Sequence, residues 1–373
     1  MNYIFKRKTR YPADYLFIAI LSFLVTFGLV MLTSASSDLG KIKFNDSYYY
    51  LKHQLNFGLL FGLFGFLIAS LIYYRFWERF AFWLLLINII MLLLVFSPFG
   101  IRIKGSERWV DFGFFSFQPA EILKFTFITY LAAWLSRNQK RSQSFSEGFL
   151  PFLILSGIIA FLLILQPATT TTIIILVTSL VVYFSGGAKF KFIIGALVIG
   201  LIAVIFFVLF IPKTDYRYER FVNFLNPQAD PLGKGYHLNQ ALIAIGSGGL
   251  KGVGYGQSTS KVNYLPEPIG DSIFAVIAEE LGFIGSIFLI FLFIILIWRS
   301  FLIGHRAPDL FSRCFAFGFG ALIGIQAFVN IAAISGIMPP TGVPLPFVSF
   351  GGTALATYLT MAGIVVNISK YRL

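Results

Sequence analysis

Apolar runs of about 20 residues recur along the whole chain and limit its fold more than any other feature. Such a run is long enough to cross the hydrocarbon core of a bilayer as a helix. Of the 373 residues, 57% are hydrophobic and only 12% are charged. No soluble domain needs so much apolar surface. The pattern predicts an all-α polytopic membrane protein in which residues 1–373 form a single integral membrane domain.

The runs predict about ten transmembrane helices. These cover roughly residues 14–35, 54–73, 77–97, 118–136, 149–166, 168–186, 190–211, 272–298, 312–336 and 348–368. An even number of spans places both termini on one side of the membrane. Lysines and arginines are more numerous in the short loops on that side, so we expect both termini in the cytoplasm. The first run follows a basic start but is too long for a signal peptide, and we interpret it as a retained span.

The net charge of +13 raises the question of a nucleic-acid partner. The basic residues are scattered through short loops, where membrane topology explains them, so we expect no nucleic-acid partner. The single cysteine, Cys314, excludes an internal disulfide and lacks the companions of a metal site.

A segment broken by proline and glycine, residues 265–271, carries Glu267 and Asp271 and precedes a long apolar run. Asp271 is a residue that can cap a helix, so we place it at the mouth of a membrane helix. Below it on the same helical face lie only small residues: Ala275, Ala278, Gly282 and Gly285. This stripe is typical either of tight helix packing or of a groove with a carboxylate at its lip.

Two more acids, Glu279 and Glu280, follow inside the same run. At 1.5 Å per residue they lie about 12–14 Å below Asp271. An ionised side chain at that depth costs several kcal/mol unless it is paired or hydrated. We therefore expect polar groups to face both glutamates.

The predicted fourth span begins with Gln-Pro-Ala-Glu at residues 118–121 and continues to Lys124. Glu121 lies in the first turn, where the helix dipole favours an anion, and Lys124 is on the same face. The two residues are either a structural ion pair or a charged wall of a cavity. Arg108 and Trp109 precede them in a segment that we place on the outer face.

Residues 212–271 form a loop too long for a simple connector, and we predict that it is extracellular, between spans 7 and 8. Its glycine-rich part, residues 246–256, could expose backbone N–H groups to a phosphate, but it lacks the ending of a nucleotide P-loop. Nearby basic residues favour an anionic, membrane-bound substrate. They are Arg217, Arg220, Lys234, Lys251 and Lys261. His237, in the same loop, is expected to be a bystander.

Residues 338–353 hold four prolines and three glycines, so they cannot form a continuous membrane helix. Broken backbone is tolerated at membrane depth only inside protein or along a cavity. We predict a re-entrant Pro/Gly segment, which includes Ser349, before span 10 and beside the outer pocket.

These motifs together resemble the SEDS family (shape, elongation, division, sporulation) over residues 14–369. The motifs are Arg108-Trp109, residues 118–124, Gly246-Ser-Gly-Gly249, residues 265–282 and residues 344–352. The sequences of residues 266–271 and of Ser34-Ala-Ser36 resemble those of the cell-division branch (FtsW) more than those of the elongation branch (RodA). The chain departs from many relatives at Ile269-Gly270, which replaces His-Thr, and at Ala168, which replaces an acid.

The resemblance implies an inverting peptidoglycan glycosyltransferase that polymerises lipid II on the outer face of the bacterial plasma membrane at the division site. The implied partners are a class B penicillin-binding transpeptidase, other division proteins and membrane lipids. The family's essential aspartate falls on Asp271, and its Glu/Lys pair falls on Glu121 and Lys124. The resemblance does not specify a cofactor. The candidate is a divalent cation, Mg or Mn, for which the sequence indicates no ligands.

We therefore expect Asp271 to be catalytic. The expected substrate-binding residues are Glu121, Lys124, Arg108, Trp109, Arg217, Arg220, Lys261, Glu267 and Ser349. Two alternatives stay open at this point. A lipid II flippase would also contain intramembrane charges and a broken helix, and a non-catalytic scaffold would only recruit the transpeptidase.

Overall fold

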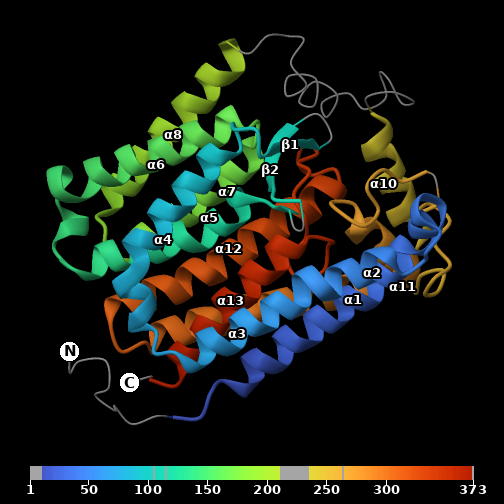
Figure 1. Ribbon diagram of the computed structural model, residues 1–373, viewed down its shortest axis with the longest axis horizontal. Coiled ribbons are helices and arrows are strands. Elements are labelled where there is room, and N and C mark those ends of the chain that lie inside the picture. Colours follow the sequence, from blue (N-terminus) through green and yellow to red (C-terminus); the bar gives the residue numbers. More distant parts are fainter. Residues whose placement is uncertain (1–10, 104–105, 114–115, 211–234, 263, 372–373) are drawn as a thin grey trace.

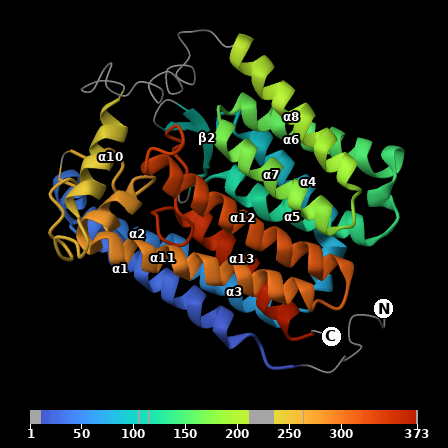
Figure 2. The same cartoon turned by 180° about the vertical axis from the view of Figure 1, so that it is seen from behind.

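The computed structural model describes residues 11–103, 106–113, 116–210, 235–262 and 264–371. Long helices run side by side in one bundle (Figures 1 and 2). The beginning and the end of the described chain meet at one end of it, where the Tyr11 N–H donates to Lys370 O and the Asp14 N–H donates to Ser369 Oγ. The helix α10 and a small sheet lie at the other end (Figure 1).

The helices follow the apolar runs, because in lipid a backbone must satisfy its own hydrogen bonds. They are α1 (Tyr15–Phe44), α2 (Tyr49–His53), η1 (Gln54–Leu59), α3 (Leu60–Leu71), α4 (Arg75–Leu94), α5 (Pro119–Ser136), η2 (Arg141–Gln143), η3 (Phe145–Phe149), α6 (Leu150–Leu165), α7 (Thr169–Ser185), α8 (Phe190–Phe210), α10 (Tyr236–Ser247), α11 (Ile273–His305), α12 (Leu310–Ile334) and α13 (Gly352–Ser369).

Each predicted span coincides with a helix or a continuous helical run. Within the described residues, seven such runs are long and apolar enough to cross a membrane. The helices α5, α7 and α8 are outside those seven; α7 has 17 residues, and α5 carries Glu121 and Lys124. The helical polytopic fold is confirmed, and the count of ten spans stays a prediction.

The centre of the bundle is formed by α12 and α13. The most apolar stretches of these two helices are 72% and 78% buried, whereas that of α4 is only 22% buried. Large side chains of α4 are about half exposed, such as Phe82 at 50% and Trp83 at 57%. A face of this kind suits lipid, so α4 belongs to the periphery and the polar residues of α12 and α13 belong to the interior.

One departure from an all-helical chain follows α4. Strands β1 (Gly100–Ile103), β2 (Ser106–Asp111) and β3 (Ser116–Phe117) form an antiparallel sheet in the order β1-β2-β3. Val110 and Phe117 of this sheet are buried together with Val95 at the end of α4. The sheet thus closes this end of the bundle over an apolar cluster of its own.

The predicted outer loop is only partly irregular. Residues 211–234 lie outside the described part, but α10 follows them, and residues 248–261 make a series of turns before α11. The loop from 212 to 271 therefore contains a helix that the sequence pattern did not predict.

The predicted break between α12 and α13 is confirmed, since residues 335–351 contain no helix. The predicted start of the last span, residue 348, is early, because α13 begins at Gly352. Leu345, Phe347 and Val348 are at most 4% exposed, so the broken backbone is buried inside protein. The broken segment packs closely against α1, since a Cβ added to Gly28 would lie 2.4 Å from Phe347 O.

We expect Gly28→Ala to lower the melting temperature of the purified protein, because overpacking of this kind costs about 1–3 kcal/mol. The matched control is Gly157→Ala in α6, where an added Cβ has nothing within 4 Å. Alanine favours a helix over glycine by about 0.5–1 kcal/mol, so the control should melt at the same temperature or higher. Equal melting temperatures for the two variants would contradict the contact.

A polar cluster joins the start of α4 to the start of α12. The Tyr74 hydroxyl donates to Asp309 over 2.6 Å, the Ser312 N–H donates to Asp309 over 2.9 Å, and Arg75 lies 3.2 Å from the same carboxylate. Burial alone raises the pKa of Asp309, but hydrogen bonds from Tyr74 and Ser312 and the charge of Arg75 outweigh it, so the pKa lies below its usual range.

A carboxyl group whose pKa is lower in the folded state stabilises the fold above its unfolded pKa, which is about 4. That contribution is lost as the pH falls through the folded pKa. We expect acid to lower the melting temperature less steeply in Asp309→Asn than in the wild type. Asp46→Asn is the control, since its exposed pair with Lys52 contributes little. Identical acid profiles for the wild type and Asp309→Asn would contradict the prediction.

Candidate active site

The start of α11 lies at the end of the molecule that also holds α10 and the sheet (Figure 1), and Asp271 lies two residues before that helix. The helix begins at Ile273 and Ser272 occupies the N-cap position, so the prediction that Asp271 caps the helix is displaced by one residue. The side chain of Asp271 is half-buried. It belongs to a short turn that the neighbouring elements hold in place.

Three consecutive backbone carbonyls of this turn accept hydrogen bonds from distant parts of the chain. The Phe350 N–H donates to Ile269 O over 2.8 Å, and the Ser349 hydroxyl donates to Gly270 O over 2.7 Å. The Asn330 side-chain amide donates to Asp271 O over 2.8 Å. A buried carbonyl without a partner costs about 1–3 kcal/mol, so these bonds fix the turn and with it the position of the Asp271 side chain.

The turn is also closed from within. The Ser272 hydroxyl donates to Pro266 O over 2.7 Å, and the Gly270 N–H donates to Glu267 O over 3.0 Å. Glu267 adopts a positive φ of 52°, which is uncommon for a residue other than glycine. His237 of α10 lies 2.7 Å from Ser272 Oγ through its Nε2. Because that hydroxyl already donates to Pro266, the histidine Nε2 is the donor in this contact.

His237 is therefore closer to the candidate site than the sequence suggested. Its signal was weak, because a histidine in an outer loop is usually a bystander. Only the packing of α10 against α11 shows that it contacts the residue next to Asp271.

Two polar residues of α12 connect the turn to the broken segment. Asn330 donates to Val343 O over 2.7 Å as well as to Asp271 O. Gln326, four residues earlier and on the same helical face, donates to Pro344 O over 2.9 Å. Sequence reasoning missed both, although a glutamine and an asparagine four apart in an apolar helix were a usable signal.

Gln326 also joins the predicted Glu121–Lys124 pair. Lys124 Nζ lies 2.7 Å from Glu121, 2.9 Å from Gln326 Oε1 and 2.9 Å from the Tyr358 hydroxyl. The side chains of Lys124 and Glu121 are 1% and 6% exposed. Lys124 has three donors and all three are used, so the arrangement is that of a structural ion pair. A role in binding substrate stays a prediction and would require the pair to give up a partner.

The glutamates deeper in α11 face polar groups, as predicted. Glu279 accepts from the Ser258 hydroxyl over 2.6 Å and from the Thr259 N–H over 3.1 Å. Glu280 lies 2.8 Å from Lys261 Nζ and accepts from the Ser34 hydroxyl over 2.6 Å.

Lys261 also donates to Gly256 O and to Ser34 Oγ, and its side chain is only 4% exposed. All three of its donors are used within the protein. Its predicted contact with substrate would require it to exchange one of these partners.

The stripe of small residues on α11 is covered by the glycine-rich turns. The N–H groups of Val253 and Gly254 donate to Glu279 O and Glu280 O. Gly282 interrupts the helix with φ 68°, and a Cβ there would lie 2.3 Å from Gly252 N. Tight packing is therefore the interpretation of the stripe that the structure supports, and these turns bind protein backbone in place of a phosphate.

The remaining predicted ligands are spread over several elements. Arg108 of β2 donates through Nε to Gln166 O over 3.0 Å and also contacts Pro167 O, so it ties the sheet to the turn before α7. Trp109 pairs with Ile101 across the hairpin and is half-buried. Arg217 and Arg220 lie outside the described residues.

Among the described residues, no group of three or more His, Cys, Asp or Glu side chains could hold a metal ion. The acid nearest in sequence to the candidate base, Asp271, is Glu267. A divalent cation stays a prediction.

We expect Lys124→Met to lower the free energy of unfolding by about 3–5 kcal/mol, because it leaves Glu121 charged and buried without its cation. The double variant Glu121→Gln, Lys124→Met should recover most of that loss, since it removes both charges. Thermal unfolding of the purified variants measures both effects. A single variant as stable as the wild type would show that the pair is not structural, whereas a stable but inactive double variant would support a role in binding substrate.

Sequence comparison places the chain among known proteins. The model of the cell cycle proteins FtsW, RodA and SpoVE matches residues 14–373. Stage V sporulation protein E of Bacillus subtilis (strain 168) is 40% identical over 362 residues, which cover 96% of this chain and 97% of that protein. The probable peptidoglycan glycosyltransferase FtsW of Trichlorobacter lovleyi is 39% identical over 357 residues, which cover 95% of this chain and 93% of that protein.

Solved structures share the fold. One match is a chain from a structure of a peptidoglycan synthase complex that concerns the structural coordination of polymerization and crosslinking. Its TM-score is 0.77 and its identity is 27%, and the match covers 96% of this chain and 97% of that one. The rod shape determining protein RodA of Thermus thermophilus matches with a TM-score of 0.70 and 24% identity, covering 96% of this chain and 97% of RodA. By its match over residues 14–373 and by its fold, the chain is a member of the FtsW/RodA/SpoVE family of cell cycle proteins, the SEDS family that its motifs resemble.

Proposed function

We propose that this protein is a peptidoglycan glycosyltransferase that polymerises lipid II into glycan strands on the outer face of the plasma membrane. The names of the FtsW relatives and the match to a chain of a peptidoglycan synthase complex support this activity. A role in cell division rests on the FtsW relatives, which are 36–39% identical.

The observation that carries the proposal is the fixed turn before α11. The carbonyls of residues 269–271 are held by α12 and by the broken segment, so the half-buried Asp271 carboxylate is positioned before substrate arrives. A base held in this way loses little entropy when it meets its substrate.

Asp271 acts in this proposal as the general base. It accepts the proton of the 4-hydroxyl group on the acceptor sugar, and that oxygen attacks the anomeric carbon of the lipid-linked donor. The bond from the anomeric carbon to the pyrophosphate oxygen breaks, and undecaprenyl pyrophosphate leaves with inversion at the anomeric carbon. Arg217 and Arg220 are the candidates for stabilising the negative charge of the leaving group.

The proposed partner is a class B penicillin-binding transpeptidase, which would crosslink the new strands. The match to a peptidoglycan synthase complex supports a partner of this kind. We place the protein in the plasma membrane at the division site, with both termini in the cytoplasm. The excess of lysine and arginine in the short loops on the side of the termini supports that orientation.

A lipid II flippase has less support. It needs polar groups that can serve a substrate crossing the membrane. The charged residues Glu121, Lys124, Glu279, Glu280 and Lys261 all have partners within the protein. None of these side chains is more than 8% exposed.

We expect Asp271→Asn to abolish glycan synthesis by purified protein given lipid II and a cognate transpeptidase, because the amide cannot accept the proton. The matched control is Asp46→Asn, which makes the same change at an exposed aspartate paired with Lys52 and should keep wild-type activity. The length and amount of glycan strands on gels measure the activity of both variants. Synthesis at the wild-type rate by Asp271→Asn would remove Asp271 from the role and favour a scaffold.

A further inference from the structure

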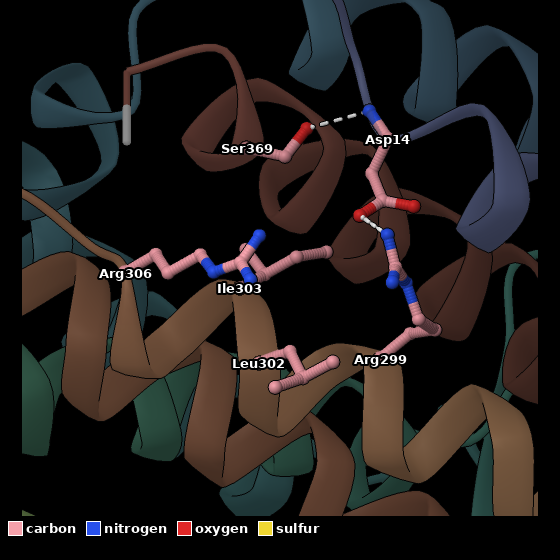
Figure 3. A pocket seen from close by; sticks show the side chains of 6 residues that line it. All are labelled: Asp14, Arg299, Leu302, Ile303, Arg306 and Ser369. Atoms are coloured by element: carbon pink, nitrogen blue, oxygen red, sulfur yellow. Dashed lines mark hydrogen bonds and ion pairs between the residues drawn. The ribbon is translucent and has the colours of Figure 1, made fainter. Parts of the chain in front are cut away.

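A small pocket at the end of the bundle opposite Asp271 has no part in the proposed reaction. It lies where α11 ends and α1 begins, and its lining residues are shown in Figure 3. They are Asp14, Arg299, Leu302, Ile303, Arg306 and Ser369. Arg299 belongs to α11, and Arg306 is the residue that directly follows the helix, two turns further on. Figure 3 shows their side chains bordering the pocket from opposite sides.

The pocket carries more positive than negative charge. Among the described residues that line it, Asp14 is the only one with a carboxylate, and both of its oxygens are used. One accepts from the Phe17 N–H over 3.0 Å and caps α1, and the other pairs with Arg299. No carboxylate among the described residues pairs with Arg306, which is exposed. Within the part of the chain that the structure describes, one full positive charge is therefore left without a counter-ion at the mouth of the pocket.

Arg299 has a donor that the protein does not satisfy. Its Nε is buried and has no hydrogen-bond partner among the described residues, while an Nη group of the same side chain binds Asp14. A buried donor without an acceptor costs about 1–3 kcal/mol. Two guanidinium groups with spare donors suit the oxygens of a phosphate better than a single point charge does.

The surroundings of the pocket indicate where such a phosphate comes from. Tyr15 and Trp298, next to the pocket on α1 and α11, are 71% and 55% exposed, and aromatic residues of this kind are typical of a membrane interface. Further along the same helices, Leu16, Phe291 and Ile294 are 48%, 55% and 55% exposed. Both helices therefore expose apolar side chains beside the pocket, as lipid-facing helices do.

We propose that this pocket binds the phosphate of an anionic phospholipid, whose acyl chains lie along the exposed apolar residues of α1 and α11. Arg306 supplies the free charge and Arg299 the free Nε donor. The lipid would hold the beginning of α1 against the end of α11, where Asp14 and Arg299 already join them. The chemistry that the pocket recognises is a phosphate group, and free inorganic phosphate is the other source of it.

The test uses the purified full chain and measures dissociation constants by native mass spectrometry with added phosphatidylglycerol. Arg306→Gln should bind about tenfold more weakly, the loss of one charge-assisted contact. The matched control is Arg313→Gln, which removes the same charge from an exposed residue of α12 at this end of the bundle and should bind as the wild type does. Arg306→Lys should bind with intermediate strength, because it keeps the charge and loses the paired donors.

Four results would overturn the proposal. Arg306→Gln could bind phosphatidylglycerol as tightly as the wild type does. Arg313→Gln could lose as much affinity as Arg306→Gln, which would show only a general attraction of anionic lipid to basic loops. Phosphatidylcholine could bind as well as phosphatidylglycerol, or inorganic phosphate at the same concentration could displace the lipid, which would leave a site for a free anion. Equal melting temperatures of all variants in phosphatidylcholine confirm that each one is folded.

Discussion

The packing of this protein around Asp271 depends on three backbone carbonyls that lie outside any helix and need hydrogen-bond donors from elsewhere in the chain. Residues 269–271 turn just before α11, and their oxygens accept from Phe350, Ser349 and Asn330. Two of the donors come from the broken segment and one comes from α12, so three distant parts of the chain must meet at one place. In a low-dielectric interior such bonds are costly to lose, which makes the position of Asp271 a property of the whole bundle.

The buried charges obey the same requirement. Lys124 and Lys261 each use all three of their donors inside the protein, and each has a glutamate as one partner. The first pair connects α5 to α12 and α13, and the second connects the glycine-rich turns to α1 and α11. Charges that look from the sequence like parts of a substrate site act in the structure as links between elements. The cost of these two lysine charges in the membrane is offset because each lies beside a glutamate.

Much of this could be predicted from the sequence. The helical spans follow from the length of the apolar runs, and the break before α13 follows from its prolines, because both depend on local backbone chemistry. The need of Glu279 and Glu280 for polar partners was also predictable, since depth alone sets that cost. Which partners they have was not predictable, because Ser258 and Lys261 reach them only through turns whose path depends on contacts with α11.

The class of the protein, its helices, the broken segment and the family motifs can all be predicted from the chain alone, because these depend on composition, on proline and glycine, and on short runs of residues. The tertiary structure alone decided that Asn330 and Gln326 of α12 join the turn at Asp271 to the broken segment. It also decided that glycine-rich turns cover the small-residue face of α11 and that His237 contacts Ser272. Contacts between residues so far apart in the chain are set by the packing of many helices at once, and no local pattern encodes them.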